Sequence, residues 1–244
     1  RAIFVFLLAY AVLLLGLMAG FLPKPAKTEK IGRDIFAVVA GRFKRVLQTR
    51  AAMGYLFFQA FSFSSMFVFL TESSFVYMKL YGVSPRLYAW MFGLNIITMA
   101  TFNRITAWRL KTGTHPQAIL KWGIIVQLGA NLLMAVSAAA FDLPPFWLLV
   151  GCVMFSVGTQ GLVSANTQAC FMGYFKEEGG SANAVLGVCQ SVIGASVCML
   201  TTWLHNGTAQ IMPLMMLAST VCGIILLRSC SHQAWKENSK AAGG

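Results

Sequence analysis

Residues 2–22 read AIFVFLLAYAVLLLGLMAGFL, a continuous run without a charged side chain. An α-helix needs about 20 apolar residues to cross the hydrocarbon core of a bilayer, and this run has that length. A secretory signal peptide is the alternative, but no small-x-small cleavage site precedes Leu22-Pro23. We therefore predict that the run is a membrane-spanning helix.

Six further apolar runs follow, each bounded by charged residues, glycine or proline. They cover residues 52–80, 86–108, 117–140, 146–171, 181–204 and 210–228. Long continuous apolar runs favour helices over the alternating pattern of a membrane β-barrel. With 57% hydrophobic and 11% charged residues, the chain is predicted to be an all-α integral membrane protein with seven transmembrane helices, antiparallel where the connections are short.

The formal net charge of +12 comes from basic residues in the connections rather than from one soluble face, so we expect no nucleic-acid partner. When the spans alternate in direction from the basic 23–51 connection, sixteen of the 19 Lys and Arg residues fall on one side of the membrane. Short basic connections stay in the cytoplasm. We predict a multi-pass inner-membrane protein whose N-terminus lies outside and whose C-terminus lies in the cytoplasm.

The 23–51 connection contains an amphipathic helical pattern. Its apolar face consists of Ile35, Phe36, Val39, Phe43 and Val46, opposite Arg42, Lys44 and Arg45. One interpretation is that this helix rests on anionic lipid as an anchor. The other is that it has a docking or regulatory role.

Glu72 is the only carboxylate inside a predicted span. At about 1.5 Å of rise per residue, it lies roughly 30 Å from the cytoplasmic start of its helix, near the outer interface. It is either hydrated there or paired with Lys79 or Arg86, or it lines a cavity, where it recognises a cationic substrate or titrates during transport.

Four amide side chains on four different spans are predicted at similar middle-to-inner depth in the membrane. They are Gln59, Asn95, Gln160 and Gln190. An amide donates and accepts hydrogen bonds without carrying a charge, which suits a substrate that is held loosely. Neighbouring aromatic rings can contact a cationic substrate. The alternative role is hydrogen bonding between helices for packing. The predicted substrate-binding residues, with Glu72, are Gln59, Phe58, Phe61, Ser62, Ser65, Asn95, Gln160 and Gln190.

Small residues recur at three-, four- and seven-residue spacing in two spans, which favours close helix packing and is compatible with sliding during transport. They are Gly151, Gly158 and Gly161, followed by Gly180, Ala184, Gly187, Ser191 and Gly194. No motif of an enzyme, metal site or cofactor site is present, and His115, His205 and His232 fall in predicted loops. We expect no enzymatic activity, metal or cofactor.

Several motifs resemble those of one transporter family. ESSFVYM at 72–78, YGVSP at 81–85 and FGLN at 92–95 resemble the seventh and eighth helices of major facilitator drug exporters, especially the bicyclomycin-resistance (Bcr/CflA-like) drug:proton antiporters. GTQGL at 158–162 and GSANA at 180–184 are similar to the region of the tenth and eleventh helices.

The resemblance implies a domain organisation. Residues 1–22 correspond to the last helix of an N-terminal bundle, 23–51 to the central cytoplasmic loop, 52–228 to the C-terminal six-helix bundle and 229–244 to a cytoplasmic tail. The spans are then helices six to twelve of a twelve-helix fold. The chain starts at Arg1 without an initiator methionine, which suggests a piece of a longer protein.

The resemblance also implies a function, namely export of lipophilic or cationic drugs by proton antiport with alternating access. The expected partners are a small-molecule substrate, a coupling proton, the lipid bilayer and the missing N-terminal helices, in a protein that is monomeric when complete. A seven-span receptor shares the topology and is the alternative function.

Overall fold

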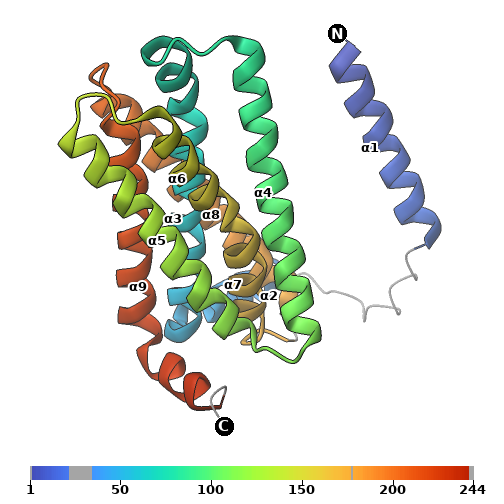
Figure 1. Cartoon of the computed structure of the whole chain (residues 1–244). Coiled ribbons are helices and arrows are strands. Elements are labelled where there is room, and N and C mark those ends of the chain that lie inside the picture. Colours follow the sequence, from blue (N-terminus) through green and yellow to red (C-terminus); the bar gives the residue numbers. More distant parts are fainter. Residues whose placement is uncertain (1, 22–34, 177, 242–244) are drawn as a thin grey trace. The chain divides into compact units, whose positions relative to one another are not determined.

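The computed structural model describes residues 2–21, 35–176 and 178–241 (Figure 1). Every regular element within these residues is a helix. The chain divides into two compact units, Arg1–Val39 and Ala40–Gly244. The boundary falls inside the helix that precedes the large bundle.

The first unit contains α1, Ala2–Phe21, which carries apolar residues on all sides. Its segment Phe4–Phe21 is long and apolar enough to cross a membrane. The helix predicted at residues 2–22 is therefore confirmed.

The second unit contains the remaining helices. They are α3 (Arg50–Ser74), continued by the π-helix η1 (Phe75–Leu80), then α4 (Pro85–Lys111), α5 (Pro116–Ala140), α6 (Phe146–Gly158), α7 (Gln160–Met172), α8 (Gly179–Leu204) and α9 (Ile211–Ala241). Proline at the first turn starts α4 and α5, and Ser84 caps α4 by accepting a hydrogen bond from the Leu87 N–H. The span predicted at 146–171 is interrupted at Thr159, where α6 passes into α7.

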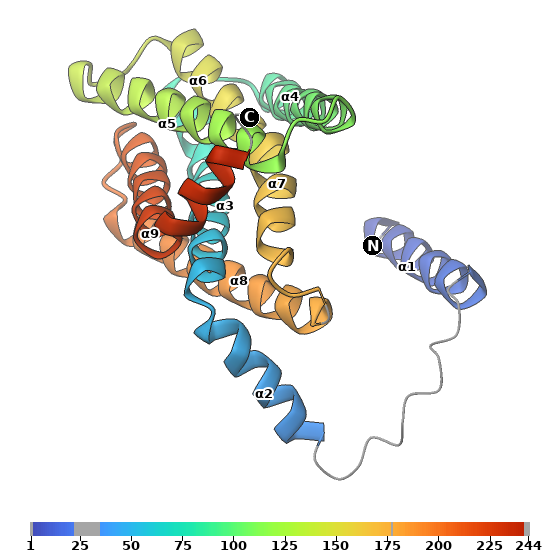
Figure 2. The ribbon, with the colours of Figure 1, turned by 90° about the horizontal axis from the view of Figure 1, so that it is seen from below.

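When α3 with η1 and α6 with α7 are each counted as one span, consecutive spans of this unit run in opposite directions, as predicted. The turns after η1, α5 and α8 lie at its top in Figure 1, while the α4–α5 turn and the end of α9 lie at its bottom. Figure 2 shows α3 in the middle of the bundle. It contacts α7, α8 and α9, so side chains of α3 meet most of the other helices.

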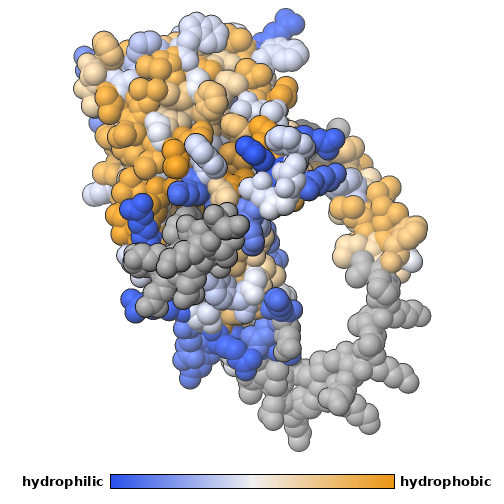
Figure 3. All heavy atoms as spheres, turned by 60° about the horizontal axis from the view of Figure 1, so that its bottom comes forward, coloured by the Kyte–Doolittle hydropathy of each residue, from blue (hydrophilic) through white to orange (hydrophobic). Residues whose placement is uncertain are grey.

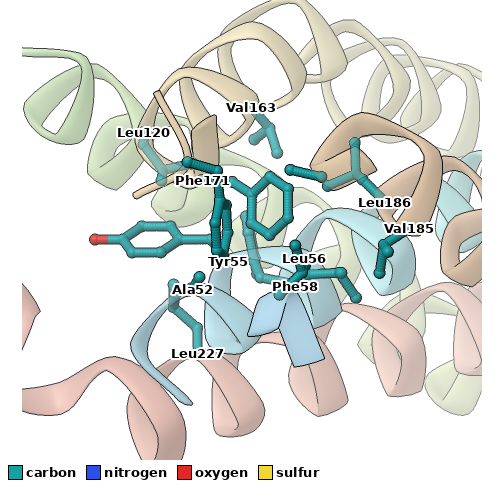
Figure 4. Close-up of a cluster of buried hydrophobic side chains, with 13 residues drawn as sticks. Ala52, Tyr55, Leu56, Phe58, Leu120, Val163, Phe171, Val185, Leu186 and Leu227 are labelled. Atoms are coloured by element: carbon teal, nitrogen blue, oxygen red, sulfur yellow. The ribbon is translucent and has the colours of Figure 1, made fainter. Parts of the chain in front are cut away.

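The core of the second unit forms two clusters of buried apolar side chains. The first includes Tyr55, Phe58, Phe171, Leu186 and Leu227, which converge from α3, α7, α8 and α9 (Figure 4). The second, toward the other end, includes Phe69, Tyr77, Met134, Leu149 and Met212. Hydrophobic side chains also cover broad areas of the surface in Figure 3, as a lipid-facing surface requires.

The predicted amphipathic helix exists as α2, Ile35–Gln48. Val46 is fully buried in the first core cluster, and Phe43 packs against that cluster. The apolar side chains of residues 43–46 therefore dock on protein, which favours the docking interpretation over lipid anchoring for this part of the helix. The side chains of Ile35, Phe36 and Val39 lie outside the described residues.

Six helical segments of the described chain are long and apolar enough to span a membrane. The seventh predicted span, 86–108, forms the long helix α4 but is not among the six. Its polar residues, which include Asn95, Asn103 and Arg104, lower its mean hydropathy. Length and apolarity alone thus identify six of the seven predicted spans.

Candidate functional site

Ser62 of α3 lies at the centre of a buried polar cluster. Gln160 Nε2 donates to the Ser62 carbonyl oxygen at 2.8 Å and lies 3.0 Å from Ser62 Oγ. Ser62 Oγ donates to Gln127 Oε1 at 2.9 Å. These bonds join α3, α5 and α7 in the interior of the bundle.

Gln59 lies one turn before Ser62 on α3. Its Nε2 donates to Ser164 Oγ on α7 at 2.9 Å. The Oε1 atoms of Gln59 and Gln160 are buried and have no hydrogen-bond partner among the described protein atoms. Each amide therefore holds α3 against α7 and retains an acceptor for water or a substrate donor.

Ser65 belongs to a second polar cluster. Asn131 Nδ2 on α5 lies 3.3 Å from Ser65 Oγ, 2.8 Å from Thr220 Oγ1 and 3.3 Å from the Met216 carbonyl oxygen. All of these polar side chains are buried. The cluster joins α3 to α5 and α9, so it stabilises the bundle.

Glu72 lies near the far end of α3 and is buried. Its Oε2 atom is 2.9 Å from His205 Nδ1, at the end of α8. Glu72 is therefore paired with His205 rather than with Lys79 or Arg86. The Lys79 ammonium group instead lies 5.8 Å from the centre of the Phe75 ring.

The other predicted site residues are not joined to these clusters. Asn95 Nδ2 donates to the Met91 carbonyl oxygen of its own helix, at 3.2 Å. Gln190 is half-buried on α8, Phe58 is inside the first core cluster and Phe61 is half-buried. Of the four predicted amides, the structure thus brings Gln59 and Gln160 together at the α3–α7 contact, and no hydrogen bond between described residues links Asn95 or Gln190 to them.

Helix α8 exposes two adjoining faces along its length. Val188, Val192, Met199 and Trp203 are large, apolar and 59–81% exposed. Beside them, at the same helical spacing, the exposed residues are small: Ala184, Gly187, Ser191 and Ala195. We call these four residues the open small-residue face of α8.

The α7–α8 corner is held by a hydrogen bond from Gln168 Nε2 to Asn183 Oδ1 at 2.9 Å. Ala165 and Ala169 of α7 are also exposed. Both helices contact α3. Exposed small side chains therefore lie both on α7, which carries Gln160, and on the adjoining helix α8.

The turns at the Glu72 end are tied together by Tyr81, whose hydroxyl donates to the Pro144 carbonyl oxygen in the α5–α6 turn. Burial raises the pKa of the Tyr81 phenol above its ordinary value, so the hydroxyl stays protonated as a donor at physiological pH.

Three important residues were not among the predicted site residues. Gln127 and Asn131 are four residues apart in a predicted span, which places them on one helix face, and this spacing was the available signal. His205 follows directly after a predicted span, so its depth matches that of Glu72. Nothing in the local sequence, however, indicates that the two residues meet.

The comparisons with known proteins identify the family. Residues 1–199 match the family described as the Major Facilitator Superfamily. The chain is 27% identical over 221 residues to the "Bicyclomycin resistance protein homolog" of Haemophilus influenzae, covering 88% of this chain and 55% of the relative. It is 25% identical over 194 residues to the "Uncharacterized MFS-type transporter YdgK" of Bacillus subtilis, covering 80% of this chain and 47% of the relative.

The chain thus spans about half the length of the curated relatives that it matches. The predicted resemblance is confirmed, and it favours a transporter over a seven-span receptor. With its apolar helices of membrane length and a family match over most of its residues, the chain is a multi-pass membrane protein that belongs to the major facilitator superfamily.

Proposed function

We propose that this chain is the C-terminal half of a secondary active transporter that exports small lipophilic or cationic compounds in exchange for protons. The complete protein would be a monomer in the inner membrane, in which the missing N-terminal helices form the opposite wall of the path. The name of the Haemophilus influenzae relative, a bicyclomycin resistance protein homologue, supports a drug as the substrate.

The two exposed faces of α8 are the observation that carries this proposal. Lipid tails pack well against Val188, Val192, Met199 and Trp203. A face of alanine, glycine and serine offers lipid little apolar area, but it allows another helix or water to approach the backbone closely. The open small-residue face is therefore suited to a water-filled path or to a moving helix contact.

The buried amides have a second role in this proposal. Ser62, Gln127 and Gln160 hold α3, α5 and α7 together, so that the half moves as a unit during alternating access. Gln190 and the free acceptor atoms of Gln59 and Gln160 are proposed to contact the substrate from behind the small-residue surface.

The orientation is also a proposal. Arg109, Lys111, Lys121 and Lys176 lie near the end of the bundle that carries the α4–α5 and α7–α8 turns. The positive-inside rule places this end in the cytoplasm. The Glu72–His205 pair then lies near the outer surface. The test is a fusion, after Ala241, of a reporter enzyme that is active only in the periplasm. Activity of this fusion would contradict the proposed orientation.

The test is to express the full-length gene in an efflux-deficient bacterial host and to measure the accumulation of bicyclomycin and ethidium. We expect lower accumulation than in the vector control, and an uncoupler of the proton gradient should abolish the difference. Accumulation equal to the vector control across a broad panel of drugs would contradict drug export. Export that persists with the uncoupler would contradict proton coupling.

A further inference from the structure

The Glu72–His205 pair combines a buried carboxylate with a partly hydrated imidazole. The Glu72 side chain is 6% exposed and the His205 side chain is 32% exposed. Because His205 Nδ1 faces Glu72 Oε2 at 2.9 Å, Nε2 is the imidazole nitrogen that remains for proton exchange with water. Histidine is also the side chain that ordinarily changes charge between pH 5 and 8.

The His205 imidazole lies at a helix end and beside an aromatic ring. His205 is the C-cap residue of α8, and its backbone N–H donates to the Thr202 carbonyl oxygen. The unpaired carbonyl groups at a helix C-terminus attract a cation. The Phe75 ring also meets the imidazole in an edge-to-face contact, with ring centres 4.6 Å apart.

One cationic side chain also lies close to the Phe75 ring. Lys79 Nζ lies 5.8 Å from the centre of the same Phe75 ring. The other ionisable groups at this end include Tyr77 on η1 and Tyr81 after it, Arg86 and Tyr88 on α4, and Asp142 in the α5–α6 turn. Tyr88 is hydrogen bonded to Ser73, and the described residues contain no ion pair of Glu72 other than that with His205.

The backbone next to the pair is irregular. Three residues after Glu72, α3 passes into the π-helix η1. Short π-helical segments occur often at functional sites and mark places where a helix changes its register. A weak hydrogen bond from Thr71 Oγ1 to Cys198 Sγ, at 3.5 Å, also joins α3 to α8 near the pair. The pair therefore joins the end of α8 to a segment where α3 changes its winding.

We propose that Glu72 and His205 form a proton-binding site within this half of the transporter. His205 takes a proton from water at Nε2, and the resulting imidazolium ties the end of α8 to α3 through the Glu72 carboxylate. When the proton returns to water from Nε2, the ion pair becomes a hydrogen bond from the neutral imidazole Nδ1–H to the Glu72 carboxylate, and the two helix ends are held more weakly. This inference rests on the proposed proton-coupled export and assigns one site to the proton.

The transport test uses the full-length protein in proteoliposomes with ethidium as the probe, over about pH 6 to 8 on the side of the α8–α9 turn. The variants are His205→Asn, which keeps an N–H donor near the Nδ1 position, and Glu72→Gln. The matched control is His115→Asn at the opposite end, since His115 makes no side-chain cap hydrogen bond. We expect both pair variants to lose the pH dependence that the wild type and the control show.

A melting measurement in detergent over the same pH range tests the site without transport. An ion pair that needs a protonated imidazole stabilises the wild type at the acidic end, and this stabilisation is lost as the pH rises and His205 loses its proton. The difference in melting temperature between wild type and His205→Asn should therefore be largest at low pH. A His205→Asn protein whose stability and transport follow the wild-type pH profiles overturns the inference. Absence of ethidium transport in every protein counts against the proposed function, and the melting result still decides on the site.

Discussion

Helices α7 and α8 carry small residues at similar spacing, but the structure uses the two patterns differently. A Cβ atom on Gly161 of α7 would lie 2.5 Å from the Met99 carbonyl oxygen and 2.7 Å from the Asn103 backbone nitrogen of α4. A Cβ atom on Gly187 of α8 would have no atom within 4 Å. The same sequence pattern therefore marks a closed helix contact on α7 and an open surface on α8.

The closed contact is also hydrogen bonded. Thr106 Oγ1 on α4 donates to the Gly161 carbonyl oxygen at 3.0 Å. Backbone atoms cannot move aside as a flexible side chain can, so this contact requires glycine. The open face of α8 has no such requirement from the described bundle. Any requirement for small residues there would come from outside the described bundle.

The largest expected effect is that of Gly161→Ala. The added methyl group must displace the backbone of α4, and overpacking of this kind destabilises a protein by about 1–3 kcal/mol. The free energy of unfolding of the full-length protein in mild detergent, measured by denaturant titration, checks this value.

Gly187→Ala is the matched control on α8. Alanine is a better helix former than glycine by roughly 0.8–1.0 kcal/mol, so we expect this variant to be as stable as the wild type or slightly more stable. Equal destabilisation by the two substitutions would break the comparison between the closed and open faces.

A somewhat smaller effect is expected for Asn131→Leu, within the closed interior. The substitution removes the contacts to Ser65 and Thr220 at a position between α3, α5 and α9. Hydrogen bonds between membrane helices contribute about 0.6–2 kcal/mol, so we expect a loss in that range. A double-mutant cycle with Thr220→Val sharpens the result, because the two losses should not be additive if the bond is shared.

The smallest effect is expected for Arg45→Gln. Arg45 Nη1 lies 2.6 Å from Glu178 Oε1, but its side chain is 73% exposed. Exposed ion pairs typically contribute about 0.2–1 kcal/mol, and salt weakens them further. We expect a small loss of stability at low salt that disappears at high salt, while a loss above that range would show that α2 docking depends on this pair.

The helices could be predicted from the sequence because the length of an uninterrupted apolar run is a local property of the chain. All seven predicted spans are helical. The antiparallel arrangement of consecutive spans follows from the short connections between them. The break at Thr159 and the π-helical segment after Ser74 depend on the packing of neighbouring helices, so no local pattern indicates them. The low mean hydropathy of α4 is due to polar residues such as Asn95 and Asn103, which can be read directly from the sequence.

The contacts of the site were harder to predict. The rise of a helix predicts similar depths for Gln59 and Gln160, and in the structure both amides make hydrogen bonds across the α3–α7 contact. Depth does not give the direction of a side chain around the helix axis. The sequence therefore could not show that Ser62 and Ser65, predicted to bind substrate, make hydrogen bonds between helices. The pairing of Glu72 with His205 joins residues far apart in sequence and requires the folded bundle.

The most direct test of the account asks which surface of this half meets water during transport. In a full-length protein without other cysteines, Ser191→Cys on the open small-residue face is compared with Ser62→Cys in the buried polar cluster. A membrane-impermeant thiol reagent should label Ser191→Cys at a rate that changes with substrate or with the proton gradient, and it should leave Ser62→Cys unlabelled. Labelling of Ser62→Cys together with an unreactive Ser191→Cys in every state would contradict the account.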